Sequence, residues 1–178
     1  MNVNLLLSDV FFAAITGFAF AYACNPPIRT LFFTAILAAI GHGFRFFLME
    51  FANIQTLALA TFLASFVVGC FGMLFAKLSK TPAEIIAFPA LLPMIPGIYA
   101  YRAILYLFSF INSNDLALKT RYLVEFFDYF LITLSVTLAL AVGVSITLII
   151  FFEQSLMMTR HSSIFDRYKK YKRTHAAT

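Results

Sequence analysis

Charged residues are scarce in this sequence. Only 12% of its 178 residues are Asp, Glu, Lys or Arg, whereas 62% are hydrophobic and the mean hydropathy is +0.89. Soluble domains carry about twice that share of charge, near 25%. So few charges exclude a soluble domain, and the chain is too short to hold a separate catalytic one. We therefore predict a single all-α, polytopic membrane protein.

The residue types that carry common catalytic and metal chemistry are also few. The two cysteines, Cys24 and Cys70, lie in or beside different apolar segments, and their spacing fits no metal motif. One histidine, His42, lies inside an apolar segment, without a Ser/His/Asp set, a thiol pair or a glycine-rich phosphate loop. These absences argue against an enzyme, a metal site and a bound cofactor.

The net charge of +5 comes from the C-terminal end. From Arg160 onward there are six Lys or Arg and one Asp, while the preceding residues carry seven positive and seven negative side chains. We divide the chain accordingly into a transmembrane domain at 1–158 and a basic cytoplasmic tail at 159–178. Basic residues clustered beside a membrane span suit binding to anionic lipids, and so short a patch argues against a nucleic-acid partner.

Five apolar segments are long enough, or nearly so, to cross a hydrocarbon core of about 30 Å, which takes about 20 helical residues. They cover residues 5–23, 30–48, 54–76, 82–111 and 122–152. Small residues at four-residue spacing, such as Ser65 and Gly69 or Ala139 and Gly143, predict close helix packing. The fifth segment is longer than one span requires, which also fits a long tilted helix.

The fourth segment contains an interruption, the Pro-x-x-Pro-Gly sequence at residues 93–97. Each proline removes a backbone donor and clashes with the carbonyl four residues earlier, so we predict that the helix breaks here. In lipid, the freed backbone groups must be satisfied by protein or by water in a cavity. Broken helices at membrane depth are typical of transporter binding sites. We therefore select Pro93, Pro96 and Gly97 as parts of a substrate-binding site.

Two polar residues of the second segment, His42 and Arg45, share one helix face because they are three residues apart. Arg45 lies near the end of its segment, so it either extends to the membrane interface or binds an anionic substrate. His42 lies deeper, either as a packed hydrogen-bonding residue or as one that titrates near neutral pH. We select Arg45 as a substrate-binding candidate and His42 as a proton-coupling candidate.

Arg102 follows the proline break, with Tyr99 and Tyr106 on the same helix face. A cation and hydroxyl groups beside a helix N-terminus would suit a carboxylate, because the terminal amides and the helix dipole favour negative charge there. Alternatively, Arg102 pairs with Asp128 or Glu125 of the last segment, and the two roles are compatible. Tyr99 and Arg102 complete our set of substrate-binding candidates.

Three stretches carry a family resemblance. They are Asn25-Pro26-Pro27-Ile28-Arg29, Ile40-Gly41-His42-Gly43-Phe44-Arg45 and the ten residues from Leu92 to Tyr101. The chain resembles the small subunit of split threonine/serine exporters of the ThrE type, over nearly its whole length up to about Phe152. It departs from them in its longer basic tail and at Arg102, where some relatives carry a smaller polar residue. The role of Arg102 therefore rests on the physical argument alone.

The resemblance implies a transporter with two components. In the split family a larger membrane subunit supplies the other half. Fused members are associated with export of threonine and serine, and the two-subunit bacterial exporter with export of succinate. We therefore expect the small subunit of a secondary exporter of small carboxylates in the bacterial inner membrane, with self-association into a homo-oligomer left open. The alternative is a non-transporting membrane scaffold or assembly factor, in which the prolines only kink a packed helix.

Positive charges predict the orientation of the chain in the membrane. After five crossings, Arg29, Lys77, Lys80 and the basic tail fall on one side, and Lys119 and Arg121 fall in a loop on the other. The positive-inside rule then places the N-terminus in the periplasm and the C-terminus in the cytoplasm.

Reporter fusions test this orientation. Fusions after Lys80, Asn114 and Thr178 should read inside, outside and inside, because each lies after another crossing. A cytoplasmic reporter at Asn114 would mean that the fourth segment re-enters the membrane, and it would contradict the five-crossing scheme.

Overall fold

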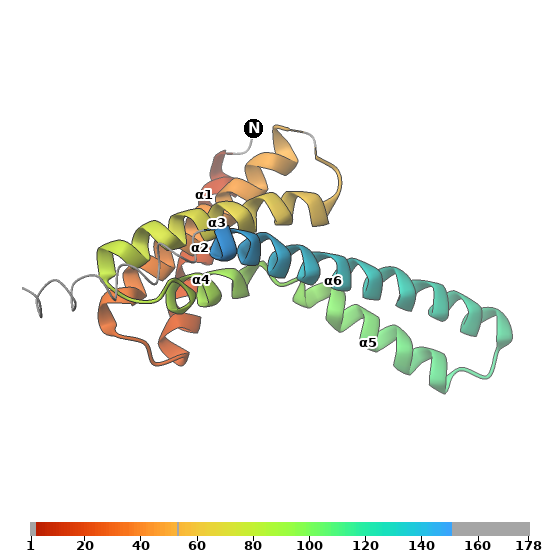
Figure 1. Cartoon of the computed structure of the whole chain (residues 1–178). Coiled ribbons are helices and arrows are strands. Elements are labelled where there is room, and N and C mark those ends of the chain that lie inside the picture. The colour runs from red at the N-terminus through yellow and green to blue at the C-terminus, as the bar shows by residue number, and fades with distance from the viewer. Residues whose placement is uncertain (1–2, 53, 151–178) are drawn as a thin grey trace, which may run out of the picture.

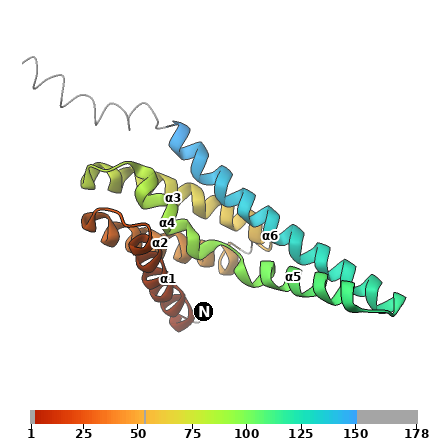
Figure 2. The same cartoon turned by 90° about the horizontal axis from the view of Figure 1, so that it is seen from below.

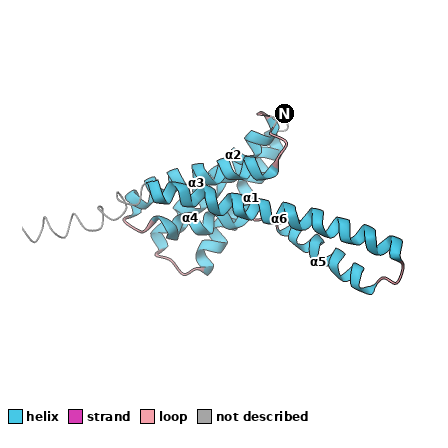
Figure 3. Cartoon of the chain, turned by 45° about the vertical axis from the view of Figure 1, so that its right-hand side comes forward, coloured by secondary structure: helices cyan, strands magenta, loops and turns pink. Residues whose placement is uncertain are grey.

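The computed structural model describes residues 3–52 and 54–150, which fold as helices joined by short loops (Figures 1 and 3). In chain order the elements are α1 (Val3–Ala23), α2 (Ile28–Glu50), α3 (Leu57–Ser79), α4 (Ala83–Leu91), the 3-10 turn η1 (Leu92–Met94), α5 (Gly97–Asn112) and α6 (Leu116–Ile150). These residues contain no strand, which confirms the all-α class. The predicted tail at 159–178 and the end of the 1–158 domain lie outside the described residues.

The predicted spans correspond to these helices. Four of them, α1, α2, α3 and α6, are long and apolar enough to cross a membrane, and the pair formed by α4–η1 and α5 raises the number to five if it acts as one span. The two halves of that pair are bent by 54° at a break between Met94 and Gly97. The bend therefore falls inside the proline-rich sequence of the fourth predicted segment.

The helices form two parts that α6 connects. The first four helices gather into a bundle, and α5 with the first half of α6 forms an antiparallel hairpin that extends away from it (Figures 1 and 2). We call this hairpin the arm. With 35 residues, α6 is about 52 Å long at 1.5 Å per residue. It therefore reaches from the tip of the arm to the bundle, where its second half packs on α3.

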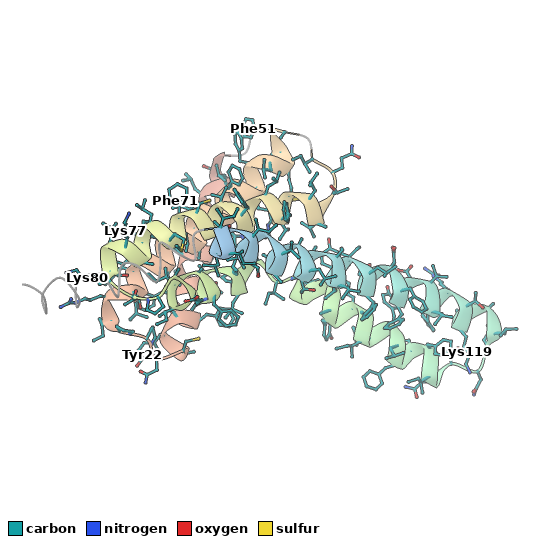
Figure 4. All side chains as sticks on the ribbon, viewed as in Figure 1. Tyr22, Phe51, Phe71, Lys77, Lys80 and Lys119 are labelled. Atoms are coloured by element: carbon teal, nitrogen blue, oxygen red, sulfur yellow. The ribbon has the colours of Figure 1, made fainter. Side chains whose placement is uncertain are left out.

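The tip of the arm corrects one detail of the sequence analysis. Lys119 and Arg121 were expected in a loop, but both lie in the first turns of α6. The helix begins this early because the Asp115 carboxylate accepts a hydrogen bond from the Ala117 backbone N–H at 3.0 Å, which caps it. Lys119 still lies at the opposite end of the molecule from Lys77 and Lys80 (Figure 4).

The core lies in the bundle, where α2, α3 and α4 meet and α6 covers one side. Its fully buried side chains are mostly small or medium in size: Leu37, Ala38, Ala64, Val68, Ile86, Ala87, Ala90 and Met94. A Cβ atom added to Gly41 would lie 2.6 Å from Val68 Cγ2 and 3.3 Å from Met94 Sδ. The glycine therefore permits α2 to approach α3 and the broken segment at this depth.

The contact between α3 and α6 uses the small residues that the spacing predicted. Ser65 Oγ donates a hydrogen bond to the Ala139 carbonyl at 3.2 Å, and a Cβ atom on Gly143 would lie 2.7 Å from the Phe62 carbonyl oxygen. Further along, Thr147 Oγ1 donates to the Phe66 carbonyl at 3.3 Å. Close backbone approach and interhelical hydrogen bonds are the forces that hold helices together in lipid.

Substitution of Gly143 tests this packing. Gly143→Ala should lower the free energy of unfolding by about 1–3 kcal/mol, because the new methyl group meets a backbone carbonyl that cannot move aside. Gly97→Ala is the matched control, since nothing lies within 4 Å of a Cβ atom there. Equilibrium unfolding of the purified protein in mixed micelles measures both. Equal stability of the two variants would contradict the interface.

Candidate functional site

The break between α4 and α5 is held by short-range backbone contacts. Pro93 lies in η1, and Pro96 precedes α5 and is buried. The Ile95 N–H donates to the Leu92 carbonyl at 3.2 Å, and the Gly97 N–H donates to the Ile95 carbonyl at 2.8 Å. These turns redirect the chain but leave the Met94 carbonyl outside the regular i to i+4 pattern of either helix.

Arg45 binds that carbonyl. Its Nη1 atom donates a hydrogen bond to the Met94 carbonyl oxygen at 3.1 Å, across 49 positions of the chain. Arg45 lies about three quarters of the way along α2, and its partner lies on the broken segment. The predicted cation and the predicted break are therefore in direct contact.

His42 connects Arg45 to a third helix. His42 Nδ1 lies 3.4 Å from Arg45 Nη2 and 3.2 Å from Asp9 Oδ2 of α1. The histidine side chain is only 10% exposed, whereas the Asp9 side chain is 39% exposed. We call Asp9, His42, Arg45 and the Met94 carbonyl the break cluster.

Asp9 was not selected from the sequence. The sequence feature that could have identified it is the presence of an acidic residue inside the first apolar segment, where ionisable side chains are costly and usually functional. Asp9 and His42 are 33 residues apart, so no helical spacing joined them. Only the antiparallel packing of α1 on α2 brings them together, and a Cβ atom on Gly43 would lie 3.0 Å from Val10 Cγ2 in that interface.

The other nitrogen of the His42 ring has no partner. Nε2 is buried and makes no hydrogen bond among the described residues. An unsatisfied buried nitrogen is costly unless a ligand or a water molecule pairs with it. His42 therefore has one nitrogen engaged in the break cluster and one that remains available.

The remaining candidates form a second group, on the arm. Arg102 Nη1 donates to the Tyr129 hydroxyl at 3.2 Å, and the guanidinium carbon lies 5.5 Å from the centre of the same ring. The rings of Tyr99 and Tyr106 also pack on Tyr129, with centres 6.0 Å and 5.5 Å away. The expected common face of α5 is thus present, and it faces α6.

The alternative partners of Arg102 are not used. In the part of the chain that the structure describes, no ion pair joins Arg102 to Asp128 or Glu125. Its contacts are a hydroxyl group and an aromatic face, neither of which neutralises its charge. The Arg102 side chain is exposed, so the charge is accessible from outside the chain.

Gly97 lies between the break cluster and the group on the arm. It is exposed, and no atom lies within 4 Å of a Cβ atom built on it. It is also the first residue of α5, where the backbone amides point toward the break. The space beside Gly97 thus borders a helix N-terminus, which favours an anion.

The break cluster has the chemistry to bind a carboxylate. A guanidinium group carries five N–H donors in a planar fork that fits a carboxylate. In the break cluster Arg45 contacts one carbonyl oxygen and one ring nitrogen, so donors remain for a ligand. An arginine and a carboxylate form stronger hydrogen bonds with each other than Arg45 forms with the neutral Met94 carbonyl.

Comparison with known proteins identifies the family of the chain. No solved structure matches the chain. Residues 9–150 match the family described as Threonine/Serine exporter, ThrE, and the matched region extends from Asp9 to the end of α6. It covers most of the chain and includes every site residue named above, which confirms that the chain is of the ThrE type. The chain belongs to the Threonine/Serine exporter family, ThrE, a family of membrane transporters.

Proposed function

We propose that this chain is the small subunit of a two-component secondary transporter, which exports small carboxylates across the bacterial inner membrane. Its substrates are succinate-like dicarboxylates, or threonine and serine. The observation that carries the proposal is the contact of Arg45 with the Met94 carbonyl, because it places a partly buried cation at a helix break. Broken helices at membrane depth bind substrates in many transporters, and the chain belongs to a transporter family.

Each candidate residue has a physical task in this proposal. Arg45 supplies positive charge to the substrate carboxylate, and His42 exchanges a proton with it or with water. Pro93 and Pro96 maintain the break, and Gly97 lets the substrate approach the positive end of the α5 helix dipole. Tyr99 and Arg102 extend the polar surface from the break along the arm.

The arm supports the need for a larger subunit. Packing of α5 is mainly against α6, and both helices carry large exposed apolar side chains. Arg102 is also exposed, although it contacts Tyr129 of α6. Lipid can cover the apolar ones, but an arginine at membrane depth needs a polar partner or the interface. A second membrane subunit packed on the arm would provide that partner, and a homo-oligomer of this chain is the competing occupant.

The orientation is part of the proposal. We place the N-terminus in the periplasm and the C-terminus in the cytoplasm, with the basic tail at 159–178 bound to anionic lipid headgroups. The separation of charges supports this: Lys77 and Lys80 lie at one end of the molecule and Lys119 lies at the other (Figure 4).

The prolines distinguish a transport site from a scaffold. Pro93→Ala combined with Pro96→Ala should let α4 and α5 join, because about 3 kcal/mol of helix penalty disappears at each site. We expect the double variant to insert and assemble like the wild type but to lose export. The measurement pairs membrane abundance with the initial export rate in vesicles that contain both subunits.

Gly97→Leu serves as a second variant of the same test. The space around Gly97 accepts a larger side chain without a clash inside the chain, so assembly should persist while bulk blocks the substrate. A scaffold predicts the reverse pattern, with assembly damaged and no separate transport defect. Export at the wild-type rate by the double proline variant would contradict the assignment of the substrate site to the break.

The two arginines should differ in their effect on transport. Arg45→Gln should raise the KM for the carboxylate by roughly 10–100-fold, since it removes a charge-assisted hydrogen bond worth about 1.5–3 kcal/mol. Arg102→Gln should raise KM less, because Arg102 is exposed on the arm and outside the break cluster. Initial rates over a range of substrate concentrations measure both. A larger increase in KM for Arg102→Gln than for Arg45→Gln would indicate that the binding site lies on the arm.

A further inference from the structure

A single atom, His42 Nδ1, has two competing partners. It lies 3.2 Å from Asp9 Oδ2 and 3.4 Å from Arg45 Nη2. A ring nitrogen that carries a proton can only donate, here to the Asp9 carboxylate, and one without a proton can only accept, here from Arg45. The two contacts therefore require two different forms of the ring, one with a proton on Nδ1 and one without.

In the first state the cluster is electrically neutral. Nδ1 carries the proton and donates to an ionised Asp9, so the carboxylate balances the positive charge of Arg45. Both residues reach the same nitrogen, which places them less than two hydrogen-bond lengths apart. At such a separation in a partly buried site, an acid offsets the charge of a neighbouring cation. A substrate carboxylate then meets little net positive charge.

In the second state the cluster has gained one proton. The proton adds at Nε2, the buried nitrogen without a hydrogen-bond partner. The Nδ1–H bond then breaks as a bond from that proton to Asp9 Oδ2 forms. The ring remains neutral, Asp9 becomes a neutral carboxylic acid, and Nδ1 accepts from Arg45. The cluster now carries one net positive charge, which is located on Arg45.

We propose that Asp9 controls carboxylate binding at the break, by holding or releasing the proton that decides whether the charge of Arg45 is balanced. Asp9 acts through Arg45 and His42 and is a positioning residue, not a binding one. The inference rests on the proposed function, because it takes the substrate to be a carboxylate held by Arg45. It adds that one proton binds together with each substrate carboxylate.

The surroundings of the ring favour this role. The charged groups that contact His42 are Asp9 from α1 and Arg45 from α2, and η1 contributes only the Met94 carbonyl through Arg45. Among the described residues, no acid or base of α3 or α4 forms a hydrogen bond or ion pair with the ring. Lys77 and Glu84 of those helices are exposed at their ends.

The central experiment compares pH profiles. With succinate or threonine as the probe, wild-type KM should fall as the pH is lowered, by up to tenfold per pH unit, as one coupled proton requires. Asp9→Asn cannot take the proton, and it leaves Arg45 unbalanced at every pH. Its KM should therefore be low and independent of pH, and kcat should fall because the bound carboxylate leaves slowly.

Two further variants isolate the acid itself. Asp9→Glu keeps the carboxylate and should restore much of the wild-type pH dependence. Asp115→Asn is the matched control, since asparagine also caps a helix and Asp115 lies at the tip of the arm. The KM of each variant is divided by the wild-type KM at the same pH, so that the effect of titration of the probe cancels. An unchanged pH slope in Asp9→Asn, with only a uniform loss of rate or abundance, would overturn the proposal.

A spectroscopic measurement separates this inference from the proposed function. Infrared difference spectra of the single chain in lipid nanodiscs, between high and low pH, should contain a band from the Asp9 carboxyl group as it gains a proton, and Asp9→Asn should lose that band. A retained band in Asp9→Asn would overturn the role of Asp9, whatever the transport result. If the wild type gives the band but neither it nor any variant exports a carboxylate, the proposed function is overturned instead.

Discussion

The hydrogen bond from Arg45 to the Met94 carbonyl is the contact on which the site depends. A chain in lipid must satisfy its backbone groups internally, and a helix broken by prolines leaves some of them unpaired. Here the side chain of a neighbouring helix satisfies one of these groups at 3.1 Å. The same contact gives a partly buried cation, which is costly at membrane depth, a partner. The break and the arginine thus stabilise each other, and a change in either one leaves the other without its hydrogen-bond partner.

This mutual dependence makes the cluster responsive to ligands. Arg45 is held by a neutral carbonyl and by a nitrogen of His42 whose proton can move, and neither is as strong a partner as a carboxylate. A structural ion pair would instead have placed an ionised acid directly on the guanidinium group. The acid that is present, Asp9, reaches Arg45 through His42, so its influence depends on one proton.

Much of the fold was predictable from the sequence, because its signals are local. Segment length gave the spans, the prolines at 93 and 96 gave the position of the bend, and four-residue spacing gave Ser65 and Gly143 as interface residues. The site was only partly predictable. His42 and Arg45 share a helix face, but Asp9 and Met94 reach them through packing of other helices, which no spacing encodes. The separation of Arg102 from Arg45 also follows from the bend and not from the sequence.

The position of Met94 relative to the bend gives the cluster mechanical consequences. Met94 is buried on the bundle side of the break, whereas α5 begins at Gly97 and packs mainly on α6. Arg45 therefore fixes the last turn before the bend, and α6 fixes the helix after it. The two prolines prevent the helices from joining rigidly. A ligand that competes with Met94 for Arg45 would weaken one of these attachments, and the 54° angle between the bundle and the arm is the quantity that can then change.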